Sequence, residues 1–272
     1  MASFDEYLDS QLARGRAYFT REEAMAAMGL AARAMSVALV RRAKKGQLVS
    51  PSRGFYLILR PEDRSIGAPD PARWIAPLMN YLQLDYRVAL LRAAAFHGSS
   101  HQAAMVFQVI VPRQIRDMAI GRQRLEFAYQ SPAAFRAVNR SDWLGTLKSD
   151  AGFAKVSGIE LTLLDCACYF HKAGGINGLA QIVKDLGGQA RPAALKQIAA
   201  FCANSSVRRL GYLLELIGHR RQADALRPLA SKAKTAALLD PAVTPLVAGL
   251  SDQSQRNSDW RLIINESVEI DS

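Results

Sequence analysis

The sequence predicts an α+β fold, in which an N-terminal winged helix-turn-helix precedes a larger α+β domain that ends in a helical part. Three observations support this fold class. Helical patterns between Asp5 and Lys45 are followed at once by a short apolar hairpin. Two apolar runs, "MVFQVIVP" and "QRLEFAYQ", are typical of strands and lie in the middle of the chain. Beyond Ser157, helical patterns dominate as far as Ala236.

Composition limits the function before any motif is considered. The chain has 272 residues, of which 50% are hydrophobic, and a formal net charge of +11. No apolar run reaches the roughly 18 residues that a transmembrane helix needs, and the acidic start is unlike a signal peptide. We therefore expect a cytoplasmic protein with a polyanionic partner, most simply a nucleic acid. Cys166, Cys168 and Cys202 are too few and too unevenly numbered to indicate a disulfide framework.

The first two helices are predicted from their end signals. A short helix follows Asp5 and ends at Gly15. The second begins at Thr20, which forms a capping box with Glu23, and it ends at Gly29.

The third helix, over about residues 31–45, is predicted to be the recognition helix. At 100° per residue, one side carries the expected core residues Ala32, Met35, Leu39 and Ala43. The opposite side faces outward and carries Arg33, Ser36, Val37, Val40, Arg41 and Lys44. Gly46 ends the helix, and the segments "QLVS" and "FYLIL" then form a hairpin with Arg53 and Gly54 at its tip.

These elements in this order indicate a DNA-binding module. Between Ala24 and Pro61 there is no Asp or Glu, although seven Lys and Arg residues lie there. Such a helix enters the major groove, where side chains near its start read bases and flanking cations bind phosphates. The alternative is that the Lys and Arg residues at the end of this helix only complement the helix dipole and stay in solvent. The residues expected to contact DNA are Arg33, Ser36, Val37, Val40, Arg41, Lys44, Lys45 and Arg53.

We assign the residues different roles within this set. Arg33 and Ser36 are the expected base readers, and Val40 suits a thymine methyl group. Arg41, Lys44 and Lys45 are expected at the phosphate backbone, and Arg53 at a phosphate or in the minor groove.

The domain boundaries are predicted from glycine and proline residues that interrupt regular secondary structure. Residues 1–66 form the predicted winged helix-turn-helix domain, and the glycine and prolines of residues 67–73 form a linker. Residues 74–272 form the α+β domain. Within it we expect a hairpin that turns at Asp150 to Gly152, a helix that a Ser157 and Glu160 capping box begins, and a closing strand from Trp260.

No pattern in the chain indicates catalysis, a metal or a cofactor. Cys166 and Cys168 would point about 200° apart on a helix, so small core side chains explain them better than a shared metal does. Gly98 interrupts the helix that His97 and His101 would need. The glycines of "AGGINGL" follow a helix and lack the lysine of a phosphate-binding loop, so two helix ends explain them better.

A second basic group lies in the helical part. We expect its members to be exposed, and a surface of that sign would hold RNA or extend the DNA contact. The alternative, which the sequence supports equally, is an exposed helix face that binds nothing. The residues put forward for this second basic surface are Arg191, Lys196, Arg208 and Arg209.

The chain resembles the AbiE-type antitoxin family of type IV toxin–antitoxin systems. The resemblance rests on "FTREEA", "ALVRRAKKGQLVSPSRGFYLIL", "YRVALLRAAAFHGSSHQ", "GFAKVSGIELTLLDCACYFHKAGGINGLAQIV" and "WRLIINESVEID". The most specific blocks are "AAAFHG" and "ELTLLD" with the following "AGG".

The resemblance implies a function. It implies that the winged helix binds inverted repeats in its own promoter and represses the operon. It also implies that the C-terminal domain neutralises a nucleotidyltransferase-like toxin without a stable complex, and that the chain is not an enzyme. A metabolite-sensing winged-helix regulator without antitoxin activity is the alternative, and a DNA-processing enzyme would need an acidic cluster or a metal that the sequence does not show.

Overall fold

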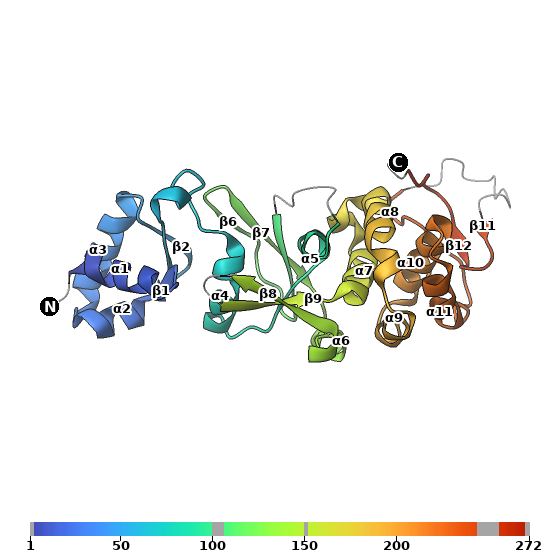
Figure 1. Ribbon diagram of the computed structural model, residues 1–272, viewed down its shortest axis with the longest axis horizontal. Helices are drawn as coiled ribbons and strands as arrows, with labels where there is room; N and C mark the ends of the chain where they lie inside the picture. The colour runs from blue at the N-terminus through green and yellow to red at the C-terminus, as the bar shows by residue number, and fades with distance from the viewer. Residues whose placement is uncertain (1–2, 100–105, 150–151, 244–255, 270–272) are drawn as a thin grey trace. The chain divides into compact units, whose positions relative to one another are not determined.

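The computed structural model describes residues 3–99, 106–149, 152–243 and 256–269 (Figure 1). The chain divides into two compact units, each interrupted in sequence. The first unit comprises Met1–Arg87, Met105–Tyr129 and Thr146–Lys155. The second unit comprises Val88–Ala104, Gln130–Gly145 and Val156–Ser272.

The first unit begins with the predicted helices, and their end signals operate as expected. Helix α1 has its own capping box between Ser3 and Glu6. The predicted box of Thr20 and Glu23 begins α2, and Gly29 ends that helix with a φ of 63°. The helices are α1 (Phe4–Ala13), α2 (Arg21–Met28) and α3 (Ala32–Lys44).

The predicted hairpin forms the wing. Gly54 has a φ of 85°, a conformation that glycine adopts without strain, and it turns the chain after Arg53. A strand of three residues, not predicted from the sequence, pairs with the second hairpin strand and completes a sheet of order β1-β3-β2. Its strands are β1 (Tyr18–Thr20), β2 (Leu48–Ser52) and β3 (Phe55–Ile58). The structure therefore confirms the winged helix-turn-helix.

The central sheet has six strands in the order β6-β7-β5-β4-β9-β8 (Figure 1). The two predicted apolar strands are β5 and β7, which pair in parallel from Val106 with Arg124 to Val111 with Tyr129. Asp150 and Ala151 of the predicted hairpin turn lie outside the described residues. The strands are β4 (Arg87–Val88), β5 (Val106–Val111), β6 (Met118–Ile120), β7 (Gln123–Tyr129), β8 (Leu144–Ser149) and β9 (Gly152–Ser157), and helix α4 (Ile75–Tyr81) precedes them.

The second unit is mainly helical, which confirms the α+β class. Its helices are α5 (Leu90–Phe96), α6 (Pro132–Val138), α7 (Ile159–Cys168), α8 (Gly175–Leu186), α9 (Pro192–Ala199), α10 (Asn204–Ile217) and α11 (Arg220–Ala230). The closing strand is shorter than predicted. It lies in a small sheet of β10 (Ala237–Leu238), β12 (Leu262–Ile263) and β11 (Arg256–Asn257). Within the described ranges, no single helix is long and apolar enough to cross a bilayer.

The predicted capping box of Ser157 and Glu160 is wrong. Gly158 is the N-cap of α7, and no side chain caps the helix. The Ser157 hydroxyl instead donates to Asp165 at 2.9 Å, and the Glu160 carboxylate accepts two hydrogen bonds from Arg191. Both side chains are buried, so tertiary partners outweigh the local pattern.

Trp260 closes the core of the second unit. Its side chain is fully buried, and its ring lies on Gly211 of α10, where an added Cβ would meet ring carbon Cζ3 at 2.0 Å. The indole Nε1 donates to Glu215 at 2.5 Å, and the Arg227 guanidinium stacks 5.2 Å from the ring centroid. The last described segment is therefore part of the helical core.

We expect Gly211→Ala to destabilise the protein by about 1–3 kcal/mol, because the new methyl group overlaps Trp260. In a Trp260→Leu background the overlap is gone, and the same change should stabilise by up to about 1 kcal/mol through helix propensity. Urea unfolding of the four proteins in this double-mutant cycle measures both effects. A loss of stability of equal size in both backgrounds would contradict the contact.

Candidate nucleic-acid interface

The rotation of α3 about its axis determines which side chains face outward. Met35 and Leu39 are buried in a cluster with Phe4, Tyr7 and Phe19. Val37 and Val40, on the other side, are each 55% exposed. Helices α2 and α3 meet at 113°, an angle typical of a helix-turn-helix.

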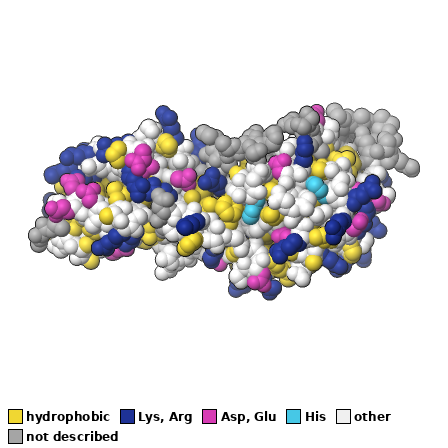
Figure 2. All heavy atoms as spheres, in the orientation of Figure 1, with side chains coloured by type: hydrophobic (Ala, Val, Ile, Leu, Met, Phe, Trp, Pro, Cys, Tyr) yellow, Lys and Arg dark blue, Asp and Glu magenta, His cyan; other side chains and the backbone are white. Residues whose placement is uncertain are grey.

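The predicted outward face is exposed along most of its length. The cations of this face point into solvent, and Figure 2 shows Lys and Arg side chains gathered along the upper left edge, over α3. A shallow hollow lined by Ser36, Val37, Val40, Arg41 and Lys44 combines an apolar strip with cationic edges. This combination suits thymine methyl groups and phosphates. The exposed predicted residues are Arg33, Val37, Val40, Arg41, Lys44, Lys45 and Arg53.

Ser36 is already hydrogen-bonded within the module. Its hydroxyl donates to the Ala32 carbonyl at 2.9 Å and accepts from Arg21 at 2.7 Å. The Arg21 guanidinium also donates to the Ala32 carbonyl, so this arginine joins α2 to α3. A base contact by Ser36 would have to compete with these bonds.

The prediction that Ala32 and Ala43 belong to the core side is wrong, because both are exposed. The apolar cluster covers the central turns of α3, and Ala32 and Ala43 lie beyond it, near the two ends of the helix.

Arg42 has a different role from its basic neighbours. Its guanidinium forms a two-point ion pair with Asp5 of α1 and lies 5.6 Å from the Phe4 ring centroid. The hydrogen bond from Arg42 lowers the pKa of the Asp5 carboxyl from its ordinary value. Arg42 therefore fastens α3 to α1 and does not belong to the outward face.

The wing is held in place from two sides. The Tyr81 hydroxyl of α4 donates to the Arg53 carbonyl at 2.8 Å, and the Arg21 N–H donates to the Gly54 carbonyl at 2.8 Å. Any side chain at position 54 would meet the Tyr81 hydroxyl, since an added Cβ lies 2.5 Å from it. The Arg53 side chain is therefore presented on a fixed backbone.

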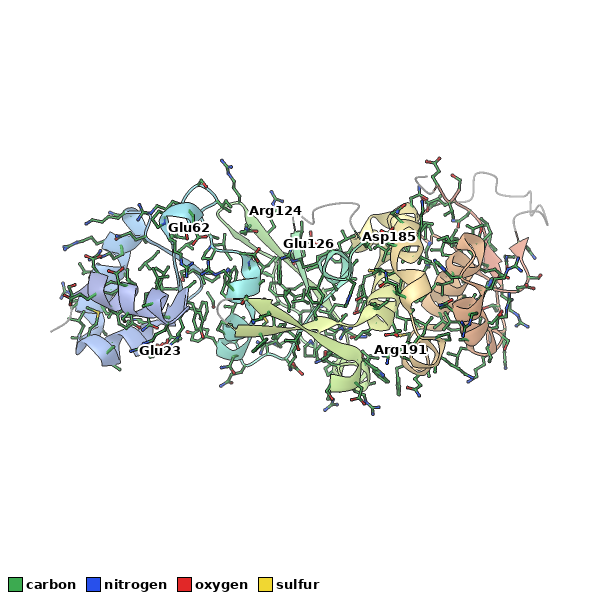
Figure 3. The ribbon with its side chains drawn as sticks, viewed as in Figure 1. Glu23, Glu62, Arg124, Glu126, Asp185 and Arg191 are labelled. Atoms are coloured by element: carbon green, nitrogen blue, oxygen red, sulfur yellow. The ribbon has the colours of Figure 1, made fainter. Side chains whose placement is uncertain are left out.

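The first unit holds further exposed cations that the sequence analysis missed. The hairpin of β6 and β7 packs on the chain just after the wing: the Arg122 N–H donates to the Ile66 carbonyl at 2.7 Å, and Gly121 contacts Gly67 so closely that no Cβ fits. The clustering of arginines between residues 113 and 124 would have been the signal. The exposed ones are Arg113, Arg116, Arg122 and Arg124, the last of which is labelled in Figure 3.

Two residues of the predicted second basic surface are not on the surface. Arg208 and Arg209 are only 6% and 3% exposed, so the expectation of solvent exposure is wrong. Arg208 donates to the Thr235 and Arg261 carbonyls, and Arg209 donates to the Leu239 and Ala167 carbonyls. Burial lowers the pKa of the Arg209 guanidinium, which lies 4.3 Å from the Phe170 ring centroid. These arginines donate to backbone carbonyls of neighbouring segments, and the Arg261 carbonyl also accepts the Ala237 N–H at 3.0 Å.

The other two residues are exposed but differ from each other. Arg191 lies over the buried Glu160 carboxylate, to which its N–H and Nε donate at 2.9 and 3.0 Å. Lys196 extends from α9 into solvent. The four predicted residues therefore do not form one surface.

The cysteines and histidines considered as metal ligands do not come together in one site among the described residues. Among the residues that the structure describes, no three His, Cys, Asp or Glu side chains are placed to hold a metal ion. Cys166 is buried and Cys168 is exposed, and His97 is bonded through Nε2 to the Ser157 carbonyl. His101 lies outside the described residues.

Comparisons with known proteins match both parts of the chain. Residues 10–58 match a family model described as a transcriptional regulator, AbiEi antitoxin, and residues 87–216 match one described as the AbiEi antitoxin C-terminal domain. The crystal structure of the RV2827C protein from Mycobacterium tuberculosis is similar in fold, with a TM-score of 0.61. The two chains are 16% identical, over 94% of this chain and 89% of that one, so this likeness shows the fold alone. No curated protein sequence matches the chain.

We expect Arg209→Ala to lower the free energy of unfolding by about 3 kcal/mol, because two buried carbonyls lose their donor and a cavity remains. Arg221→Ala removes the same charge from the exposed face of α11 and should change stability by less than about 0.5 kcal/mol. Urea unfolding compares the two variants. Equal stability of both would show that Arg209 is not a structural donor.

Proposed function

Because the chain belongs to the AbiEi antitoxin family of antitoxins and transcriptional regulators, we propose that it represses its own operon and neutralises a nucleotidyltransferase-like toxin, as the antitoxin of a type IV system. We assign it no catalytic step. In this proposal residues 1–66 bind DNA, residues 67–73 are a linker, and residues 74–272 act on the toxin.

The observation that carries the DNA-binding part is the exposed face of α3. Buried Met35 and Leu39 turn the cations and the two exposed valines outward, and the wing presents Arg53. We propose that Arg33 and Ser36 read bases, and that Val37 and Val40 contact thymine methyl groups. Arg41, Lys44, Lys45 and Arg53 then bind phosphates, which supply affinity without sequence preference.

The operator is proposed to consist of inverted repeats. One short recognition helix reads only a few base pairs, and two copies on a symmetric site supply enough specificity. Arg122 and Arg124 of the β6 and β7 hairpin are further candidates for phosphate contacts, since they are exposed in the same unit as the wing.

We predict different effects for the two kinds of contact. Arg33→Ala should reduce the preference for operator over unrelated DNA, with a loss of about 1–3 kcal/mol on the operator. Lys44→Ala or Arg53→Ala should weaken binding to both DNAs alike and reduce the salt slope by about one. Gel shifts on the upstream promoter at several salt concentrations measure these quantities.

Arg221→Ala, which removes one exposed charge from the second unit, is the matched control and should leave the salt slope unchanged. The DNA-binding proposal would be wrong if a triple alanine variant of Arg33, Arg41 and Arg53 bound the promoter as the parent does.

The antitoxin part predicts a separation of functions in the full-length chain. The triple alanine variant, expressed from an unrelated promoter, should fail to repress the native promoter and still restore growth of cells that express the neighbouring nucleotidyltransferase toxin. The reason is that the altered residues lie on the module proposed to bind DNA. A growth assay and a promoter fusion measure the two functions.

If the unaltered protein fails to restore growth although it is folded and represses its promoter, the antitoxin proposal fails and the regulator remains. A metabolite-sensing regulator is the second candidate function. It is favoured by a cavity of about 300 Å³ in the second unit, where apolar and polar side chains converge.

A further inference from the structure

Two aromatic rings and a guanidinium gather at the surface of the second unit, from segments far apart in the sequence. The Trp143 and Phe201 ring centroids lie 6.0 Å apart, and the ring planes are tilted by 47°. The Arg140 guanidinium lies 5.3 Å from the Trp143 ring centroid and 6.0 Å from that of Phe201. Arg140 and Trp143 follow α6, whereas Phe201 follows α9 (Figure 1). We call these three side chains the stacking patch.

The stacking patch is open to solvent. Phe201 is 47% exposed, Arg140 is exposed, and Trp143 is partly exposed. Ala200 and Ala203, close to Phe201 in the chain, are exposed as well, and their methyl groups are too small to cover its ring. A single exposed phenylalanine is common on protein surfaces, but two rings and a guanidinium from distant segments form a defined surface for another flat group.

The backbone beneath the stacking patch is held in place. The Trp143 N–H donates to the Arg140 carbonyl at 3.0 Å, and the Trp143 carbonyl accepts the Gly158 N–H at 2.9 Å. The Phe201 N–H donates at 3.0 Å to the carbonyl of Ile198, whose side chain is fully buried. A surface that is already ordered loses less conformational freedom when it binds a partner.

The two segments that carry the stacking patch are basic. Residues 130–141 and residues 186–214 contain no Asp or Glu. Asp142, next to Trp143, is an exposed acid at the border of the first segment, and Arg191 is paired with Glu160. The exposed cations of the two segments nevertheless outnumber this acid, so the surface favours a polyanion. They are Arg136, Arg140, Arg191 and Lys196.

Flat groups joined by negative charges are the features of an unpaired nucleic acid. Unpaired bases stack on aromatic rings and on guanidinium planes, and basic side chains bind the phosphates between them. A duplex keeps its base faces stacked inside, so it offers this surface charge alone. DNA is mostly duplex, whereas RNA exposes unpaired loops and ends, so RNA is the source that fits. An acidic protein segment supplies charge without a series of flat groups.

We propose that the stacking patch binds unpaired RNA. A base stacks on the Phe201 ring and the Arg140 guanidinium, Trp143 supports the stack, and the exposed cations of the two segments attract the phosphates. The site goes beyond the proposed function, because it uses neither α3 nor the wing and requires neither operator nor toxin.

Tryptophan fluorescence tests this proposal in the full-length protein. The chain has 3 Trp residues, and Trp74 and Trp260 are fully buried, so a change on binding reports Trp143. A short single-stranded RNA of mixed sequence should quench the fluorescence in a saturable way. The same RNA paired with its complement, and polyglutamate of the same charge, should bind at least about tenfold more weakly, because neither offers a base face. Absence of saturable quenching, or equally tight binding of either competitor, would overturn the proposal.

Variants separate stacking from charge. Phe201→Ala should weaken binding of labelled RNA about tenfold. Arg140→Lys keeps the charge and removes the flat guanidinium, so it should also weaken binding. Phe153→Ala, at a phenylalanine of the first unit that is 66% exposed, is the matched control and should bind RNA as the parent does. Circular dichroism establishes that each variant is folded, and parental affinity in both patch variants would show that the patch does not bind RNA.

A last titration separates this site from the winged helix. The triple alanine variant of Arg33, Arg41 and Arg53 changes no residue of the stacking patch, so RNA should quench its fluorescence as in the parent. Loss of quenching in that variant would place the RNA on the winged helix and overturn the inference. Failure of operator binding by the unaltered protein, with quenching intact, would count against the proposed function alone.

Discussion

The burial of Met35 and Leu39 against Phe4, Tyr7 and Phe19 is the interaction on which the proposed DNA-binding face of α3 depends. A helix presents a new side every 100°, so any other rotation of α3 would bury valines or cations that now face solvent. The Asp5 and Arg42 pair holds the same rotation from the helix end, because it draws one cation of the basic run inward. The same two apolar side chains therefore pack the core and determine which side of α3 faces solvent.

The arginines that contribute to the net charge of the chain have two different roles. On α3 and the wing, Arg33, Arg41, Lys44, Lys45 and Arg53 are exposed. On α10, Arg208 and Arg209 are buried and donate to backbone carbonyls of segments far away in sequence. The net charge therefore overstates how much positive charge is exposed on the surface, where a polyanion would contact it. Depth of burial, and not charge, separates the arginines proposed to bind DNA from those that hold the fold together.

Features that depend on neighbouring residues could be predicted from the sequence. The Thr20 and Glu23 box, the Gly54 turn and the outward face of α3 each follow from a few adjacent positions. The second capping box failed because Glu160 has a stronger partner in Arg191, more than a helix away. The cavity could not be predicted at all, since Leu91, Gln181 and Glu269 meet only through the fold.

The contact between Trp260 and Gly211 has a consequence for synthesis. Domains fold as the chain leaves the ribosome, from the N-terminus onward. The face of α10 that receives the indole stays uncovered until Trp260 has emerged. The winged helix has no such dependence, because its core residues all lie before Leu59. A ribosome that stalls before Trp260 has emerged would therefore carry a finished winged-helix module attached to a helical part that still exposes apolar surface to chaperones and proteases.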